Sequence, residues 1–200
     1  MKKLFYTAIL LFSFSFVALA QESGKLELSI YGGAKMYQAN KKAYEYHFKP
    51  GFGLGVEGKY QIYNQVYWVF GLNGGTDDGT SLTDNDDQGV SHNISYYRRD
   101  YNALTGLGVN LYEAKQFSVY AQAMTGIGFV QGSTGRIVNS KPSNVIRESI
   151  LEVNYLLSAG TGLDYQIGER WKVGAFYNYS YLGDFDGSHM VGAKVSFIIP

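Results

Sequence analysis

Large apolar side chains alternate with small or polar side chains over most of this chain. In the segment 52–62, every even-numbered position except Gly58 is large and apolar or aromatic, and every odd-numbered position is glycine, charged or an amide. Successive side chains of a β-strand point to opposite faces, so this segment has one apolar face and one small, polar face. The same alternation recurs in eight segments, which predicts an all-β fold.

The eight predicted strands are long, and their connections alternate in length. The strands cover about 25–36, 52–62, 66–74, 99–111, 117–130, 153–167, 171–182 and 190–199. Most exceed the ~9–11 residues that a tilted strand needs to cross a bilayer. Tight turns at 63–65, 113–116 and 168–170 alternate with connections at 37–49, 75–93, 131–152 and 183–188, of which the last is short. Short turns on one side and longer loops on the other are typical of an eight-stranded antiparallel up-and-down transmembrane β-barrel with both termini on the turn side.

Aromatic residues gather near the tight turns, on the face that the alternation assigns to the outside. Rings at a membrane interface can bury their body in lipid while a polar tip stays in water. β-Propensity also favours aromatic residues, but it does not explain their clustering at strand ends on one face. The predicted girdle at the turn side consists of Tyr60, Trp68, Phe117, Tyr165, Trp171 and Phe197.

The opposite face combines glycines, bulky aromatics and charges. Glycines on alternate strands, as in Gly53-Leu-Gly55 and Gly106-Leu-Gly108, leave room for large inward side chains on other strands. A buried unpaired charge is costly, so the inward acids and bases are predicted to form a paired polar network. Its members are Glu27, Glu57, Lys59, Asp164, Lys172 and Lys194. Because eight strands enclose little lumen, the network is interpreted as a plug, with a pore lining as the alternative.

The N-terminus has the features of an export signal. Lys2 and Lys3 precede an uncharged apolar run over 4–17, and Ala18-Leu19-Ala20 fits the small-x-small cleavage rule. The sequence thus predicts a signal peptide at 1–20, cleaved after Ala20, and a barrel domain at 21–200. The apolar run is short for a membrane-spanning helix, which disfavours an uncleaved anchor.

Composition narrows the possible functions. Cleavage would remove two lysines from a chain of 17 basic and 17 acidic residues, leaving a formal charge of −2, so a basic nucleic-acid binder is excluded. The absence of cysteine excludes disulfides, thiolate metal sites and a cysteine nucleophile. The pattern Gly53-x-Gly55-x-x-Gly58 lies within a strand rather than before a helix, so it does not indicate a dinucleotide site. The acidic stretch from Asp84 has Ser95 where a calcium loop needs glutamate. No cofactor and no metal are expected.

The whole predicted barrel resembles the small eight-stranded bacterial outer-membrane barrels, similar to OmpX and the membrane domain of OmpA. The resemblance rests on the predicted signal peptide, the alternating strands and the final strand 191–197. In that strand the alternation places Phe197 on the outer face. In that class an outward aromatic ends the chain and is read by the barrel assembly machinery, whereas here Ile198-Ile199-Pro200 follow it. The resemblance implies a monomer in the lipid bilayer of the outer membrane.

The long loops are the predicted functional surface. The first is aromatic and basic, and the second is acidic; tyrosine-rich loops make good contact surfaces at low entropy cost. The residues chosen as candidates for contact with a surface ligand are Tyr44, Tyr46, His47, Asp84, Asp86 and Asp87. The leading hypothesis is a structural or adhesion-type envelope protein that acts through these loops.

Three alternatives remain open from the sequence. A narrow passive pore, porin-like in function, would conduct small solutes. A lipid-modifying enzyme would need a base beside a nucleophile, and the candidate His92 lies near Ser91 and Ser95 without any fixed triad. We therefore assign no catalytic residue. A soluble lipocalin-like carrier would place its apolar face inside, against the outward girdle and inward charges.

Overall fold

A computed structural model describes residues 24–38, 50–76, 81–85, 91–137, 145–183 and 185–199. For 81–97, 132–152 and 185–186 the description covers the backbone alone. The predicted signal peptide therefore lies outside the described residues and stays a prediction. In the described part of the chain, no helix is long and apolar enough to cross a membrane.

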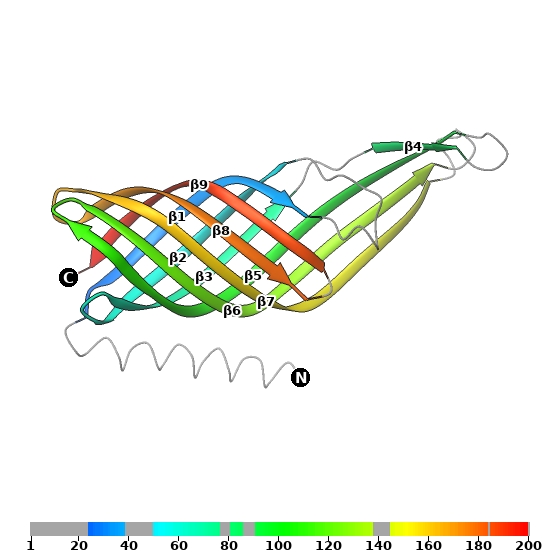
Figure 1. Ribbon diagram of the computed structural model, residues 1–200. Coiled ribbons are helices and arrows are strands. Elements are labelled where there is room, and N and C mark those ends of the chain that lie inside the picture. Colours follow the sequence, from blue (N-terminus) through cyan, green and yellow to red (C-terminus); the bar gives the residue numbers. More distant parts are fainter. Residues whose placement is uncertain are drawn as a thin grey trace.

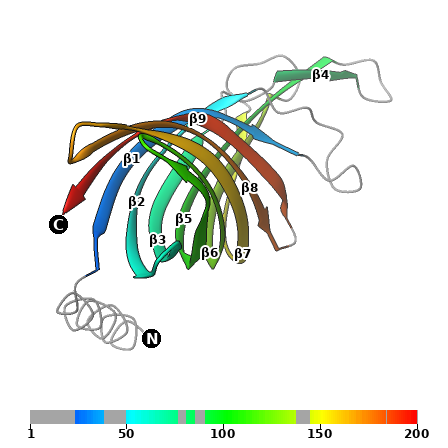
Figure 2. The ribbon, with the colours of Figure 1, turned by 60° about the vertical axis from the view of Figure 1, so that its left-hand side comes forward.

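The described elements are antiparallel strands, and eight of them close into a barrel (Figures 1 and 2). They are β1 (Leu26–Tyr37), β2 (Gly51–Tyr63), β3 (Val66–Thr76), β4 (Ser81–Asn85), β5 (Ser91–Ala114), β6 (Phe117–Ile137), β7 (Val145–Ile167), β8 (Trp171–Leu182) and β9 (Phe185–Ile199). The first and last strands pair over their whole common length, and β3 pairs directly with β5. Since β4 pairs with β5 outside this ring, the predicted eight-stranded antiparallel barrel is confirmed.

The strands on one side of the barrel extend much further than the sequence indicated. β5, β6 and β7 have 24, 21 and 23 residues, whereas β8 has 12. They project beyond the barrel together with β4 (Figure 1). The prediction that 75–93 and 131–152 are loops is therefore wrong for much of their length, because β4 and the extended strands pair there. Asp84, chosen as a loop residue, lies in β4.

The turns have the conformations that their residues permit. Asn64 and Lys115 adopt positive φ in the two-residue turns after β2 and β5, and Gly168 has φ of 66° after β7. Asparagine and glycine tolerate this left-handed region well, which is why the chain can reverse direction over so few residues. The three predicted tight turns are thus confirmed, and both ends of the described chain lie at this turn side, with Leu26 opposite Ile199.

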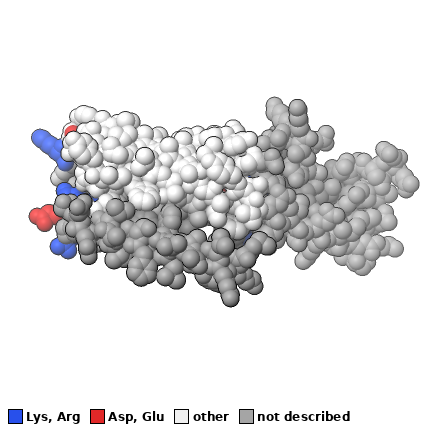
Figure 3. All heavy atoms as spheres, turned by 90° about the horizontal axis from the view of Figure 1, so that it is seen from below, with Lys and Arg blue, Asp and Glu red and all other residues white. Residues whose placement is uncertain are grey.

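The barrel is apolar outside and filled inside. Along β1, for example, Ile30 is 68% exposed, whereas its neighbours Ser29 and Tyr31 are buried. The same alternation holds on the other barrel strands, so the outward side chains form an apolar wall. Charged side chains in Figure 3 gather at the turn end, and the visible wall beyond them carries none. An apolar outer wall around a packed interior fits burial of the strands in lipid.

Candidate functional site

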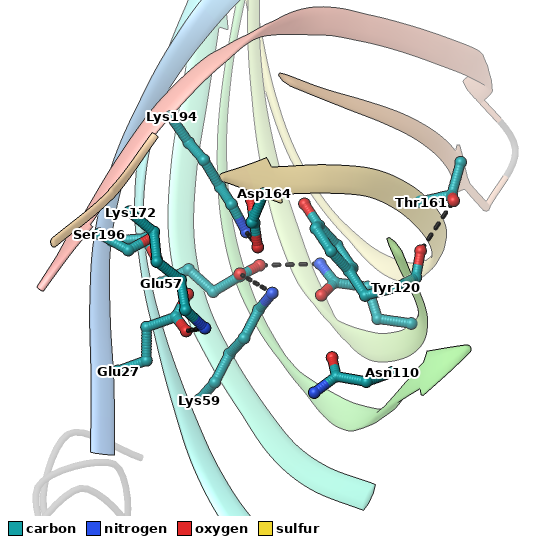
Figure 4. A network of polar contacts seen from close by, with 12 residues as sticks. Glu27, Glu57, Lys59, Asn110, Tyr120, Thr161, Asp164, Lys172, Lys194 and Ser196 are labelled. Carbon is teal, nitrogen blue, oxygen red and sulfur yellow. Dashed lines mark hydrogen bonds and ion pairs between the residues drawn. The ribbon is translucent and has the colours of Figure 1, made fainter. Parts of the chain in front are cut away.

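Six predicted network residues face the barrel interior near the turn end, and they form defined pairs. Lys172 Nζ lies 2.6 Å from Glu27 Oε2, and Lys194 Nζ lies 2.9 Å from Asp164 Oδ2. Lys59 Nζ lies 3.6 Å from Glu57 Oε1. These side chains come from β1, β2, β7, β8 and β9 and point toward one another across the lumen (Figure 4). We call this group the inner network.

The ring of Tyr120 is the centre of the inner network. Lys59 Nζ lies 3.6 Å from the ring centroid and Lys194 Nζ lies 4.0 Å from it. The negative faces of the aromatic ring attract both ammonium groups, which adds to their ion pairs. Gly162 gives the ring its space, because a Cβ there would lie 2.5 Å from the Tyr120 hydroxyl. A glycine thus faces a bulky inward residue, as the sequence predicts for the interior.

Beyond the inner network, an apolar cluster crosses the interior. Leu104, Leu156 and Leu182 lie in one register row over β5, β7 and β8, with Gly126 of β6 in the same row. The cluster also contains Tyr67, Val69, Tyr120, Met124 and Val130. The prediction of a polar interior is therefore incomplete, because its middle is apolar. The alternation of side chains along each strand already assigns Leu104 and Leu156 to the inner face. That alternation was sufficient to predict their inward position.

A second ion-paired group lies at the outer end of the interior. Lys35 is paired with Asp100, and both side chains are buried. The Tyr37 hydroxyl donates to Asp100 Oδ1 at 2.5 Å, and Asn102 Nδ2 donates to Oδ2 at 2.8 Å. The guanidinium of Arg98 lies 4.5 Å from the centre of the Tyr37 ring. The sequence did not predict this outer network, although the alternation along β1 and β5 assigns Lys35 and Asp100 to the inner face.

The turn end of the barrel is open and forms a polar cup of about 450 Å³. Its floor includes Glu27, Lys59 and Lys172 of the inner network, and its wall includes turn residues such as Lys115 and Arg170. The inner network and then the apolar cluster lie beyond the cup in the barrel interior.

The predicted girdle residues all lie on the outward face near the turns. The rings of Phe117 and Tyr165 are 5.0 Å apart, and so are those of Trp171 and Phe197. Tyr60 and Trp68 are register partners on β2 and β3. The Trp68 indole donates to Thr105 Oγ1 at 2.6 Å, so its one polar group is satisfied within the wall.

The predicted contact residues are beyond what the structure describes. Tyr44, Tyr46, His47, Asp86 and Asp87 lie outside the described residues, and for Asp84 the backbone alone is described. They stay predictions.

The sequence matches the model of the outer membrane protein β-barrel domain over residues 7–198. The chain belongs to the outer membrane protein β-barrel family. Its location is accordingly the outer membrane, and the resemblance to small outer-membrane barrels is confirmed. A sequence comparison with curated proteins finds no match.

Several solved outer-membrane structures are similar to this family member. Ail, the attachment invasion locus protein of Yersinia pestis, in complex with the heparin analogue sucrose octasulfate, is 19% identical with a TM-score of 0.55, over 87% of this chain and 99% of Ail. Neisserial surface protein A is 12% identical with a TM-score of 0.54, over 88% of this chain and 99% of that protein. The outer membrane protease OmpT of Escherichia coli is 10% identical with a TM-score of 0.51, over 88% and 97%. At these identities the likeness shows the fold alone.

The filled interior predicts that the barrel does not conduct. Val69 and Leu156 are 0% and 1% exposed, and charged side chains are paired on either side of the apolar cluster. The mature chain, refolded and inserted into a planar bilayer, should show no discrete current steps. A gel-mobility shift between unboiled and boiled samples would confirm folding. Steady openings in a folded sample would contradict this prediction and support the pore hypothesis.

Proposed function

We propose that this family member acts at the cell surface, by presenting its projecting strands and long connections to partners outside the cell, with no transport through its interior. The observation that carries the proposal is the length of β5, β6 and β7. About 9–11 residues suffice to cross a bilayer, and these strands have roughly twice that number. Their additional residues lie at the end opposite the turns, which is the outer end in this class of barrel.

The projecting sheet offers a strand edge for recognition. β7 pairs with β6 from Val145 onward, but its pairing with β8 begins only at Leu156. Within the described residues, no strand pairs with the other side of 145–155. An unpaired edge presents backbone N–H and C=O groups, to which an extended peptide can add as a further strand. In this proposal the tyrosine-rich and acidic connections contribute side-chain contacts as well.

The two other functions considered from the sequence have less support. A pore requires a continuous polar path, and the buried apolar cluster across the interior argues against one. An enzyme requires a base beside a nucleophile. Among the described side chains, the one histidine is His189, which contacts the Tyr177 hydroxyl at 2.6 Å and the Tyr179 ring rather than a serine or a carboxylate. We propose no enzymatic activity.

Protease treatment of intact cells tests which end is displayed. Trypsin should cleave after Lys41 or Lys42, in the first long connection, and leave Lys115 and Arg170 of the turns uncut. In lysed cells the turn sites should become accessible as well, which serves as the internal control. Peptides would be identified by mass spectrometry. Protection of the long connections, or cleavage of the turns in intact cells, would contradict surface display in this orientation.

Removal of the projecting hairpin tests whether it mediates contact. In the variant, residues 133–149 are replaced by Asn-Gly, which closes β6 and β7 near the barrel rim with a favoured hairpin turn. Cells producing the full chain should adhere to surfaces coated with heparin, an analogue of which is bound in the similar Ail structure, about tenfold better than cells producing the variant. A matched control, Lys115→Asn in a turn at the opposite end of the barrel, should adhere like the full chain. Equal adhesion of the folded hairpin variant would reject the proposed role of β5–β7.

A further inference from the structure

The polar cup at the turn end has an uneven distribution of paired and unpaired charges. At its floor, Glu27 and Lys172 are paired, and Lys59 pairs with Glu57. At its mouth, Lys25, Lys115 and Arg170 line the cup, and none of these three cations has an ion-pair partner among the described residues. The floor charges named here are therefore ion-paired, whereas the three mouth cations face solvent.

The cations at the mouth exceed the acids there. Glu113 and Glu169 are the carboxylates of the lining outside the inner network, and Asn110 Nδ2 already donates to Glu113 at 2.5 Å. Lys115 and Arg170 are exposed residues of two neighbouring turns, which follow β5 and β7, and Lys25 directly precedes β1. Figure 3 shows the basic side chains gathered at this end. The local excess of positive charge contrasts with the formal charge of −2 expected for the mature chain.

The rest of the lining is rich in amides. Six carboxamide side chains line the cup: Gln61, Asn64, Gln65, Asn110, Gln116 and Gln166. An amide offers several donors and acceptors. Four of the six already use one of these groups within the protein, namely Gln61, Asn110, Gln116 and Gln166. The groups that remain can pair with the hydroxyl and amide groups of a hydrophilic ligand. The volume of about 450 Å³ lies within the range of ordinary small-molecule sites, although the lining is far more polar than usual.

We infer that the cup is a binding site for a small hydrophilic ligand that carries a carboxylate together with amide or hydroxyl groups. Lys115 and Arg170 would hold the carboxylate at the mouth, and the amides would pair with the remaining polar groups. The turns of this class of barrel face the periplasm, so the ligand would enter from there. Because the inner network and apolar cluster close the floor, the ligand docks and is not transported. This inference does not rest on the proposed surface function.

The experiment is an NMR titration of the ¹⁵N-labelled mature chain, refolded in zwitterionic detergent micelles. The probe is N-acetylmuramyl dipeptide, which has one carboxylate besides amides and hydroxyls. N,N′-Diacetylchitobiose is the control probe, since it has amides and hydroxyls but no carboxylate. We expect saturable shifts for backbone amides around the cup with the first probe, and at least about tenfold weaker binding of the second, since charge-assisted hydrogen bonds are the stronger ones.

Two variants assign the effect to the mouth. The double variant Lys115→Asn and Arg170→Gln should weaken binding of the dipeptide probe by about tenfold or more, and asparagine at position 115 suits the positive φ of that turn. Arg99→Gln, an exposed basic residue of β5 far from the turns, is the matched control and should bind like the parent chain. Absence of saturable shifts at millimolar probe, or equal binding by the double variant, would overturn the inference.

A second arm separates a soluble ligand from a lipid headgroup. The chain is placed in nanodiscs of phosphatidylcholine, with or without phosphatidylglycerol. If the three cations serve anionic headgroups instead, phosphatidylglycerol will shift the turn resonances and the dipeptide probe will not, which would also overturn the inference. Shifts with the probe in phosphatidylcholine alone support the cup as the site.

Discussion

Replacing Asp164 with alanine is expected to lower the free energy of unfolding of the barrel by about 3–5 kcal/mol, the usual cost of removing one partner of a buried ion pair. Asp164 and Lys194 are 3% exposed each, and their charged atoms lie 2.9 Å apart. Without the carboxylate, the Lys194 ammonium would remain buried beside Tyr120, whose other close contact is the Lys59 ammonium. Two cations would then share one ring with one fewer anion nearby.

A second substitution tests whether the loss of stability comes from the Lys194 ammonium that is left buried without its partner. Lys194→Met keeps most of the side-chain volume and removes the ammonium, so the double variant should recover more than half of the loss. Stability would be measured by urea titration of the refolded chain in lipid vesicles, with fluorescence of Trp68 and Trp171 and gel mobility as readouts. A loss below about 1 kcal/mol for Asp164→Ala would indicate a solvent-screened pair and would contradict the buried network.

Gly126→Ala should destabilise the barrel by about 3 kcal/mol or more, because overpacking a tight site forces the backbone to move. A Cβ at Gly126 would lie 1.9 Å from the carbonyl oxygen of Ala103 on β5. Backbone cannot move aside as a flexible side chain can, and Gly126 lies in the same register row as Leu104 and Leu156 of the apolar cluster. We expect either a failure to refold or a much lower midpoint in urea.

The matched control is Gly71→Ala, on β3 and also directed into the barrel. Its nearest obstacle is the carbonyl oxygen of Val56 at 3.2 Å, so a displacement of a few tenths of an ångström would relieve the contact. The same urea titration should find this variant close to the parent chain. Similar stability of Gly71→Ala and Gly126→Ala would mean that β5 and β6 are further apart than the structure places them.

Much of the fold was predictable because strand parity is a local property. A residue such as Ile30 or Glu27 is assigned to a face by its neighbours along the chain, without knowledge of any other strand. The turns were equally predictable, since Gly168 and Asn64 occur where two apolar alternations break. The extended ends of β5 and β7 were not predictable, because beyond the membrane the alternation no longer separates lipid from lumen and polar residues suit a strand or a loop.

The candidate site, too, was predictable only in part from the sequence. Parity placed Asp164 and Lys194 inside the barrel, but it gave no partner for either, since partners across the lumen depend on strand tilt and on the register stagger around the ring. The same stagger brings Lys35 to Asp100 and aligns Leu104 with Leu156 and Leu182.

The sequence by itself determined that this chain is an outward-apolar barrel of eight strands with its turns on one side. Tertiary structure alone decided the pairing of its buried charges, the apolar cluster across its interior, the volume of the cup and the projection of β5–β7. The physical reason is the distance along the chain over which each property is set. Residues a few positions apart decide which face a side chain occupies and where a turn occurs. The level of a side chain along the barrel axis, and the residue that it meets across the lumen, depend on the closure of all strands together.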